Sequence, residues 1–190
     1  MKTSPLQLKW LTYPEASYEL STEFDGDTSA PIDVDVDAQV RYALDGAHSA
    51  FVCISSKDDV PAAYKFKVTA LAGFSFDLDI AKEAYKPKSA TGLPPVIAVN
   101  VARVLYSSAR EQLAMLTSRA PYSSVMLKSV LLEPRDVEIS SPGSSPVEVL
   151  REVFKASDEE ILAIAGRNSD SGVTPRSPKK SSAAASKKKA

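Results

Sequence analysis

Few side chains in this sequence are suited to catalysis. His48 is the only histidine of the 190-residue chain, and it follows a turn dipeptide, Asp45-Gly46. Acid–base catalysis needs a histidine held by polar partners, and no G-x-S-x-G or other nucleophile motif accompanies this one. Cys53, the only cysteine, lies among apolar neighbours, which is typical of an unreactive core thiol. We therefore predict that His48 is a surface or edge residue and that the protein is not an enzyme.

Carboxylates recur at alternate positions, which raises the question of a cation site. Asp33, Asp35 and Asp37 form one such run, and Asp77 and Asp79 form another. Spacing of i, i+2 places strand residues on one face, so these runs indicate the solvated face of a sheet. The chain has no His/Cys cluster with zinc spacing and no Gly-rich phosphate loop. We expect neither a metal nor a cofactor.

The charge of the chain is divided unevenly along its length. Residues 167–190 contain seven Lys or Arg and one acid, whereas the remainder carries a net charge of −7. The Lys/Ser/Ala/Pro composition of this basic tail predicts disorder, because it offers little apolar surface to bury. Lysines neutralise phosphate charge, so contact with nucleic acid or acidic lipid is one interpretation, and a solubilising tail is the other.

Period-two alternation of apolar and polar residues dominates the first half of the chain. Leu6, Leu8 and Trp10 share one face of a first strand, and the pattern resumes over residues 18–24. Longer alternations follow over residues 32–44, 51–54 and 64–78. One packed and one wet face are typical of antiparallel sheets, so we predict an antiparallel sheet.

The spacing of apolar residues then changes to a helical one. Pro94-Pro95 suits a helix start, and the periodicity predicts a helix of about 20 residues that ends near Arg119, before Pro121. Residues 125–132 fit either a strand or an extended packing segment. The sequence thus predicts an α+β protein with one long helix.

Three parts of the chain differ in composition. We predict a folded domain over residues 1–141, a linker with short helices over 142–166, and the disordered tail over 167–190. Ser157 and Glu160 match a capping box for one of the short helices. No basic-then-apolar leader opens the sequence and no apolar run reaches bilayer-spanning length, so we expect a cytoplasmic location. The lone cysteine fits a reducing compartment.

Three segments of the sequence resemble one protein family. Residues 106–130 (YSSAREQLAMLTSRAPYSSVMLKSV), residues 63–76 (AYKFKVTALAGFSF) and residues 15–19 (EASYE) are similar, in order, to segments of the SecB protein-export chaperones. The first departs from the family at Ser107-Ser108, where Pro-Tyr is usual. The matches span roughly residues 6 to 130.

The resemblance implies a fold, a four-stranded antiparallel sheet packed with one long helix and short C-terminal helices, and it also implies a function. SecB proteins are ATP-independent chaperones that assemble as a dimer of dimers, hold unfolded preproteins in apolar grooves and pass them to the SecA translocation motor. On this basis, Phe66, Val68 and Ala70 are expected to line the subunit contact. Glu15 and Glu19 match acidic positions that engage the motor.

One departure bears on the motor. Lys65 and Lys67 stand where the family has an apolar and an acidic residue at the motor-binding surface. Because like charges at a contact are unfavourable, this substitution argues against delivery to SecA. An alternative is therefore a SecB-like chaperone dedicated to one partner, such as an antitoxin. A further alternative is a nucleic-acid-associated structural protein that acts through the basic tail.

A chaperone that holds unfolded chains needs apolar side chains left at its surface. Five aromatic residues of the predicted strands are the candidates for client binding; they are Trp10, Tyr18, Tyr64, Phe74 and Phe76. The alternative for each is a place in the core. An open strand edge beside such a patch would bind any extended chain through backbone hydrogen bonds.

Overall fold

The computed structural model describes residues 4–21, 32–57, 63–120 and 124–163. The basic tail and residues 22–24 of the first alternation lie outside these ranges. The described chain is α+β, as predicted. Its strands are β1 (Leu6–Leu20), β2 (Val34–Arg41), β3 (His48–Ser56), β4 (Tyr64–Phe76) and β5 (Glu138–Ser140), and its α-helices are α1 (Leu78–Tyr85), α2 (Leu93–Thr117) and α3 (Pro146–Glu152). Short 3₁₀ turns occupy Ala90–Gly92 and Pro134–Asp136.

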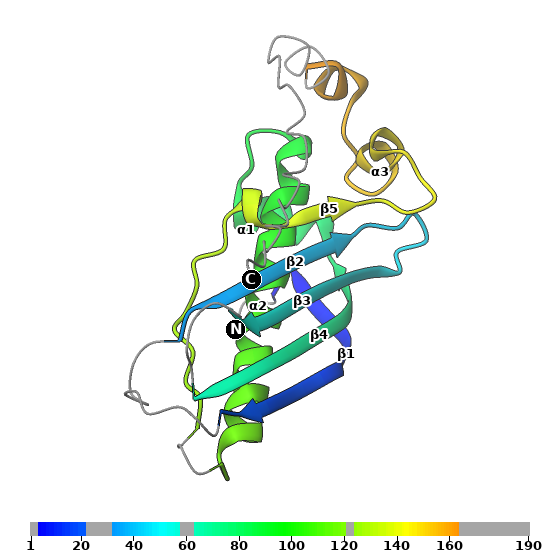
Figure 1. The fold of residues 1–190 in the computed structure, drawn as a ribbon. Coiled ribbons are helices and arrows are strands. Elements are labelled where there is room, and N and C mark those ends of the chain that lie inside the picture. The colour runs from blue at the N-terminus through cyan, green and yellow to red at the C-terminus, as the bar shows by residue number, and fades with distance from the viewer. Residues whose placement is uncertain (1–3, 22–31, 58–62, 121–123, 164–190) are drawn as a thin grey trace, which may run out of the picture.

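The strands form one sheet in the order β1-β4-β3-β2-β5. The pairs β1–β4, β4–β3 and β3–β2 are antiparallel. The prediction of four antiparallel strands is therefore incomplete, because β5 adds a short parallel edge beside β2. Three residues of pairing carry too little pattern for sequence analysis to detect. Helix α2 lies across one face of the sheet, and the other face is open (Figure 1).

Alternation along the strands explains this two-layer arrangement. On β3 and β4 the residues facing α2 are buried, and those between them are partly exposed or exposed, apart from Thr69 and Gly73 of β4, which are also buried. The turn between β2 and β3 is the expected Asp45-Gly46: Gly46 has a φ of 79°, and Asp45 Oδ1 accepts a hydrogen bond from the Ala47 amide at 2.9 Å. A positive φ is easily adopted by glycine, so this dipeptide fixes the hairpin.

Helix α2 is longer than predicted, starting at Leu93 and ending at Thr117. Beyond it, residues 124–132 form an extended packing segment rather than a strand. Three hydrogen bonds hold this segment against the helix: Tyr106 Oη donates to the Lys128 carbonyl (2.7 Å), Arg103 donates to the Leu132 carbonyl (2.7 Å), and the Val125 amide donates to Thr117 Oγ1 (2.8 Å).

Two further local predictions meet different outcomes. The alternation does not continue through residue 78, because Asp77 caps α1 by accepting hydrogen bonds from the amides of Asp79 and Ile80. The capping box is confirmed: the Ser157 amide donates to Glu160, and the Glu160 amide donates to Ser157 Oγ at 3.3 Å.

Candidate polypeptide-binding surface

Five of the residues singled out from the sequence lie beneath α2. Tyr64, Phe66, Val68, Ala70 and Phe74 are 5% exposed or less. Their alternation places them all on the helix-covered side of β4, where they form the core. In this conformation Phe66, Val68 and Ala70, expected at a subunit contact, are core residues, as are Tyr64 and Phe74, expected to bind clients; both roles stay predictions. Phe76 is partly buried and packs against the same core.

His48 is also inside the protein, contrary to the prediction of a surface residue. Its ring stacks on Phe76 at a centroid distance of 5.2 Å and also contacts Phe74 and Tyr42. Nδ1 accepts a hydrogen bond from the Ala43 amide at 3.2 Å, which requires the unprotonated nitrogen. Burial lowers the pKa of His48, and the nearby Asp45 carboxylate opposes this effect. The histidine thus serves packing.

Strand β1 forms one edge of the sheet and is interrupted by two irregularities in its pairing with β4. The register shifts between Leu8 and Trp10 and again between Thr12 and Glu15. The first shift turns Trp10 to the open face, where it pairs with Gly73 instead of continuing the face of Leu6 and Leu8. After the second shift the strand is regular to its end, so a stretch of edge backbone faces away from β4.

An apolar line follows the helix side of β1. Leu11, Tyr18 and Leu20 are 37%, 37% and 40% exposed there, so α2 covers this edge only in part. Tyr13, between them, donates a hydrogen bond to the Ser108 carbonyl of α2 at 3.3 Å. This contact shows which flank of α2 faces β1.

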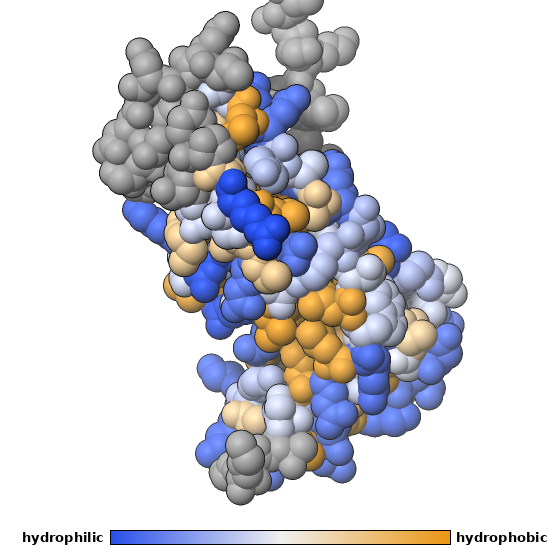
Figure 2. All heavy atoms as spheres, turned by 90° about the horizontal axis from the view of Figure 1, so that it is seen from below, coloured by the Kyte–Doolittle hydropathy of each residue, from blue (hydrophilic) through white to orange (hydrophobic). Residues whose placement is uncertain are grey.

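The same flank of α2 carries exposed apolar side chains. Val104 and Met115 are 41% and 71% exposed. At 3.6 residues per turn, both lie within about 40° of the direction of Ser108. Figure 2 shows apolar side chains gathered on the face seen from below, the side on which β1 and the C-terminal half of α2 lie in Figure 1. We call Leu11, Tyr18, Leu20, Val104 and Met115 the edge patch.

The open face of the sheet carries the charged residues expected at a motor contact, but they are paired. Lys67 Nζ lies 2.8 Å from a Glu15 carboxylate oxygen, and Glu19 is directly opposite Lys65 in the register. The hydrogen bond and charge of Glu15 raise the pKa of Lys67. Facing pairs of opposite charge neutralise each other, so this part of the face is not an acidic surface.

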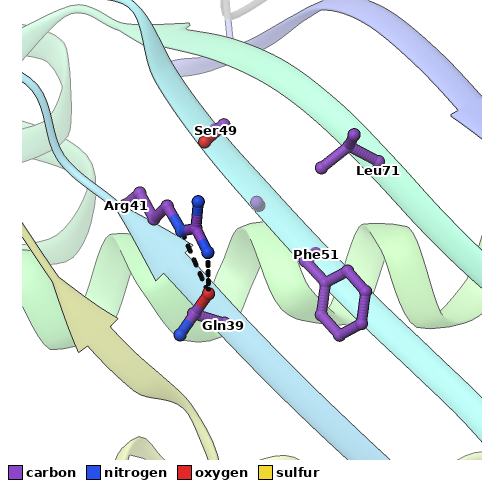
Figure 3. A pocket seen from close by; sticks show the side chains of 6 residues that line it. Gln39, Arg41, Ser49, Phe51 and Leu71 are labelled. Atoms are coloured by element: carbon purple, nitrogen blue, oxygen red, sulfur yellow. Dashed lines mark hydrogen bonds between the residues drawn. The ribbon is translucent and has the colours of Figure 1, made fainter. Parts of the chain in front are cut away.

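A hollow lies on the same open face, nearer to β2. It has a volume of about 200 Å³ and is lined by Gln39, Arg41, Ser49, Ala50, Phe51 and Leu71. Figure 3 shows Arg41 and Gln39 joined on one side and the side chains of Phe51 and Leu71 on the other. Cys53, predicted to be a core thiol, is partly exposed on this face two residues beyond Phe51.

The described residues offer little to other kinds of ligand. No His, Cys, Asp or Glu side chains of residues 4–21, 32–57, 63–120 and 124–163 gather as a metal site would require. In the same residues, no helix is both long and apolar enough to cross a bilayer.

Neither a protein-family model nor a curated protein sequence matches the chain. Among solved structures, one similar chain is the SecB-like chaperone Rv1957 of Mycobacterium tuberculosis, in complex with a ChAD peptide from the Rv1956 HigA1 antitoxin. The match covers 66% of this chain and 91% of that one, with 13% sequence identity and a TM-score of 0.48.

The alternating pattern of the sequence indicates part of these surfaces. It identifies Trp10 and Tyr18, which are exposed. It does not identify Leu11, because the register shift after Leu8 moves this residue out of the alternation. Helical spacing places Val104 and Met115 on one side of α2. Whether they are exposed cannot be predicted from this spacing, because it depends on how much of α2 the sheet covers. The hollow is lined by residues of β2, β3 and β4, so its existence depends on the register in which these strands pair, which the sequence pattern does not show.

Proposed function

We propose that this protein is a SecB-like holding chaperone that binds an extended, non-native segment of a partner polypeptide without nucleotide or catalysis. The observation that carries the proposal is the edge strand β1, whose regular final stretch forms one edge of the sheet beside the edge patch. Natural edges are usually blunted, and Pro14 and the two shifts do so for the first part of β1 only. The three segments that resemble SecB support the same function.

The chemistry of this surface suits an unfolded chain. Edge backbone groups can add a strand from any sequence, because main-chain hydrogen bonds do not depend on side chains. The apolar residues on the helix side would then cover alternate side chains of the bound strand. The single cysteine fits a cytoplasmic site of action, and we propose a tetrameric dimer-of-dimers assembly on the basis of the sequence resemblance.

A dedicated partner is favoured over general export by the charges of the open face. Glu15 is occupied by Lys67, and Glu19 faces Lys65. A motor that recognises acidic side chains would have to displace these lysines. We therefore place delivery to SecA behind the single-partner alternative. If the protein bound many unfolded proteins equally well and also bound SecA measurably, general export would be favoured over a single partner.

The function is tested by light scattering of an unfolded client as it refolds and aggregates. Wild-type protein at near-stoichiometric amounts should suppress the scattering. Leu20→Ser should weaken client binding about fivefold, because covering the 40% exposed part of a leucine contributes about 1 kcal/mol. The matched control is Leu44→Ser in the β2–β3 turn, a 47% exposed leucine outside the edge patch. No suppression across several clients, or equal loss in both variants, would contradict the proposal.

A further inference from the structure

The hollow on the open face has apolar walls that the fold itself does not require. Phe51 of β3 pairs with Leu71 of β4 in the register, and both point away from α2. No helix covers this side of the sheet in Figure 1. Large apolar side chains on the wet face of a two-layer sheet are more typical of a contact surface than of a core.

Arg41 gives the hollow a positively charged wall. Its Nε and Nη2 both donate to Gln39 Oε1, at 3.0 and 2.8 Å, and this fork fixes the plane of the guanidinium. Among the residues that the structure describes, Arg41 forms no ion pair, whereas Lys57, Lys67 and Arg151 each have a carboxylate partner. A guanidinium oriented by a neutral amide keeps its charge available for an incoming carboxylate.

We propose that this hollow binds an internal segment of an extended polypeptide in which a large apolar side chain is next to Asp or Glu. The proposal rests on the proposed function and names the sequence that a partner presents to this face. The apolar side chain contacts Phe51 and Leu71, and the carboxylate accepts hydrogen bonds from Arg41. A volume of about 200 Å³ suits one side chain, since small-molecule sites are commonly larger, about 300–1,000 Å³.

Arg41 belongs to a row of paired residues that crosses the sheet, and this row shows which other side chain a bound segment would reach. Trp10, Gly73, Ser49 and Arg41 are consecutive partners across β1, β4, β3 and β2. Strands lie about 4.8 Å apart, so Trp10 and Arg41 are separated by about 14 Å, the length of about four extended residues. A segment lying across the strands therefore reaches the exposed Trp10 indole when its carboxylate is at Arg41.

The test compares two fluorescein-labelled, C-terminally amidated octapeptides that are identical except for an internal Phe-Glu or Phe-Gln pair in a Gly/Ser background. Fluorescence anisotropy with the full chain should show about 1.5- to fivefold tighter binding of the Phe-Glu peptide, the range for an exposed charge pair. Added salt should reduce this ratio. Arg41→Gln should abolish the ratio. Arg119→Gln, which removes an exposed arginine at the end of α2, should preserve it.

A second measurement uses Cys53, which lies on the same face as Phe51 and is the only cysteine of the chain. The Phe-Glu peptide should slow maleimide modification of Cys53 in the wild type and in Arg119→Gln, but not in Arg41→Gln. Circular dichroism checks that the variants are folded.

Three results would overturn the inference: equal affinity of the wild type for both peptides, loss of the affinity ratio in Arg119→Gln, or an unchanged ratio in Arg41→Gln. If aggregation is still suppressed in any of these cases, the proposed function stands and the site alone fails. If the wild type holds no unfolded client, the proposed function fails, and the peptide ratio then decides whether the hollow is a binding site.

Discussion

Replacing Gly73 with alanine should separate Trp10 from the sheet. A Cβ atom built on Gly73 would lie 2.2 Å from Trp10 Nε1 and 2.5 Å from Cε2, far inside contact distance. The indole therefore rests directly on the backbone of β4, and only a residue without a side chain permits this position. Because Trp10 is 50% exposed, the ring has room to move outward.

The size of the effect follows from the buried half of the indole. Burying a whole aromatic side chain covers 150–250 Å², so the covered half of Trp10 is about 100 Å² and contributes about 2.5 kcal/mol at 25 cal/mol per Å². A tilted ring should lose about half to three quarters of this. Alanine in a strand recovers about 0.5–1 kcal/mol relative to glycine, so Gly73→Ala should lower the free energy of unfolding by about 0.3–1.4 kcal/mol.

Trp10 is the only tryptophan, so its fluorescence reports the displacement directly. In Gly73→Ala the emission should move to longer wavelength and acrylamide should quench it more readily. A double-mutant cycle with Trp10→Ala, followed by urea unfolding and circular dichroism, measures the coupling. Without the indole, Gly73→Ala should be stabilising by about 0.5–1 kcal/mol, so the sign of its effect reverses.

The decisive observation is the reversal in sign of the effect of Gly73→Ala on the free energy of unfolding when Trp10 is removed. If Gly73→Ala destabilises equally with and without Trp10, the alanine acts on the strand itself and the stacked position of the indole is wrong. Unchanged emission in Gly73→Ala would contradict it as well. A client that binds at Trp10 should also lose affinity in Gly73→Ala, whereas Leu44→Ser should have no such effect.

Three further predictions concern the core. The pKa of His48 is lower in the folded protein than in the unfolded chain, where it is about 6.5. The stability that this residue contributes is therefore complete above about pH 6.5 and is lost as the pH falls through the folded pKa. His48→Gln should remove this part of the pH dependence of urea unfolding. Thr117→Val should destabilise by about 1–3 kcal/mol in thermal unfolding, because it leaves the buried Val125 amide without its acceptor. Phe154→Ala, at a fully buried ring stacked on Phe76, should cost about 3–5 kcal/mol in urea unfolding.

The elements that the sequence predicts correctly are those with sustained periodicity. Strand β2 and helix α2 carry their pattern over several turns or residue pairs, so the local signal is strong. Asp45-Gly46 identifies the hairpin through backbone conformation alone. These features require no knowledge of the rest of the molecule.

The features that escaped prediction depend on distant residues. The shift between Leu8 and Trp10 is a property of the pairing of β1 with β4, and it decides which face receives the indole. His48 follows a turn, where exposure is expected, but Phe74 and Phe76 from later in the chain pack against its ring. The hollow beside Arg41 likewise exists only when β2, β3 and β4 are in register.

The two irregularities in β1 give one strand access to both surfaces proposed here. Trp10 and Leu11 are adjacent in the chain, yet Trp10 lies on the open face opposite Gly73 and Leu11 on the helix face opposite Ala72. Because β1 is an edge strand, neither residue is shielded by a further strand on its outer side. An extended partner that pairs with the regular stretch of this edge would lie beside Tyr18 and Leu20, and a second segment of the same partner would cross the open face to Trp10. Because two linked segments bind more tightly than either alone, binding at one surface should favour binding at the other without a change of fold.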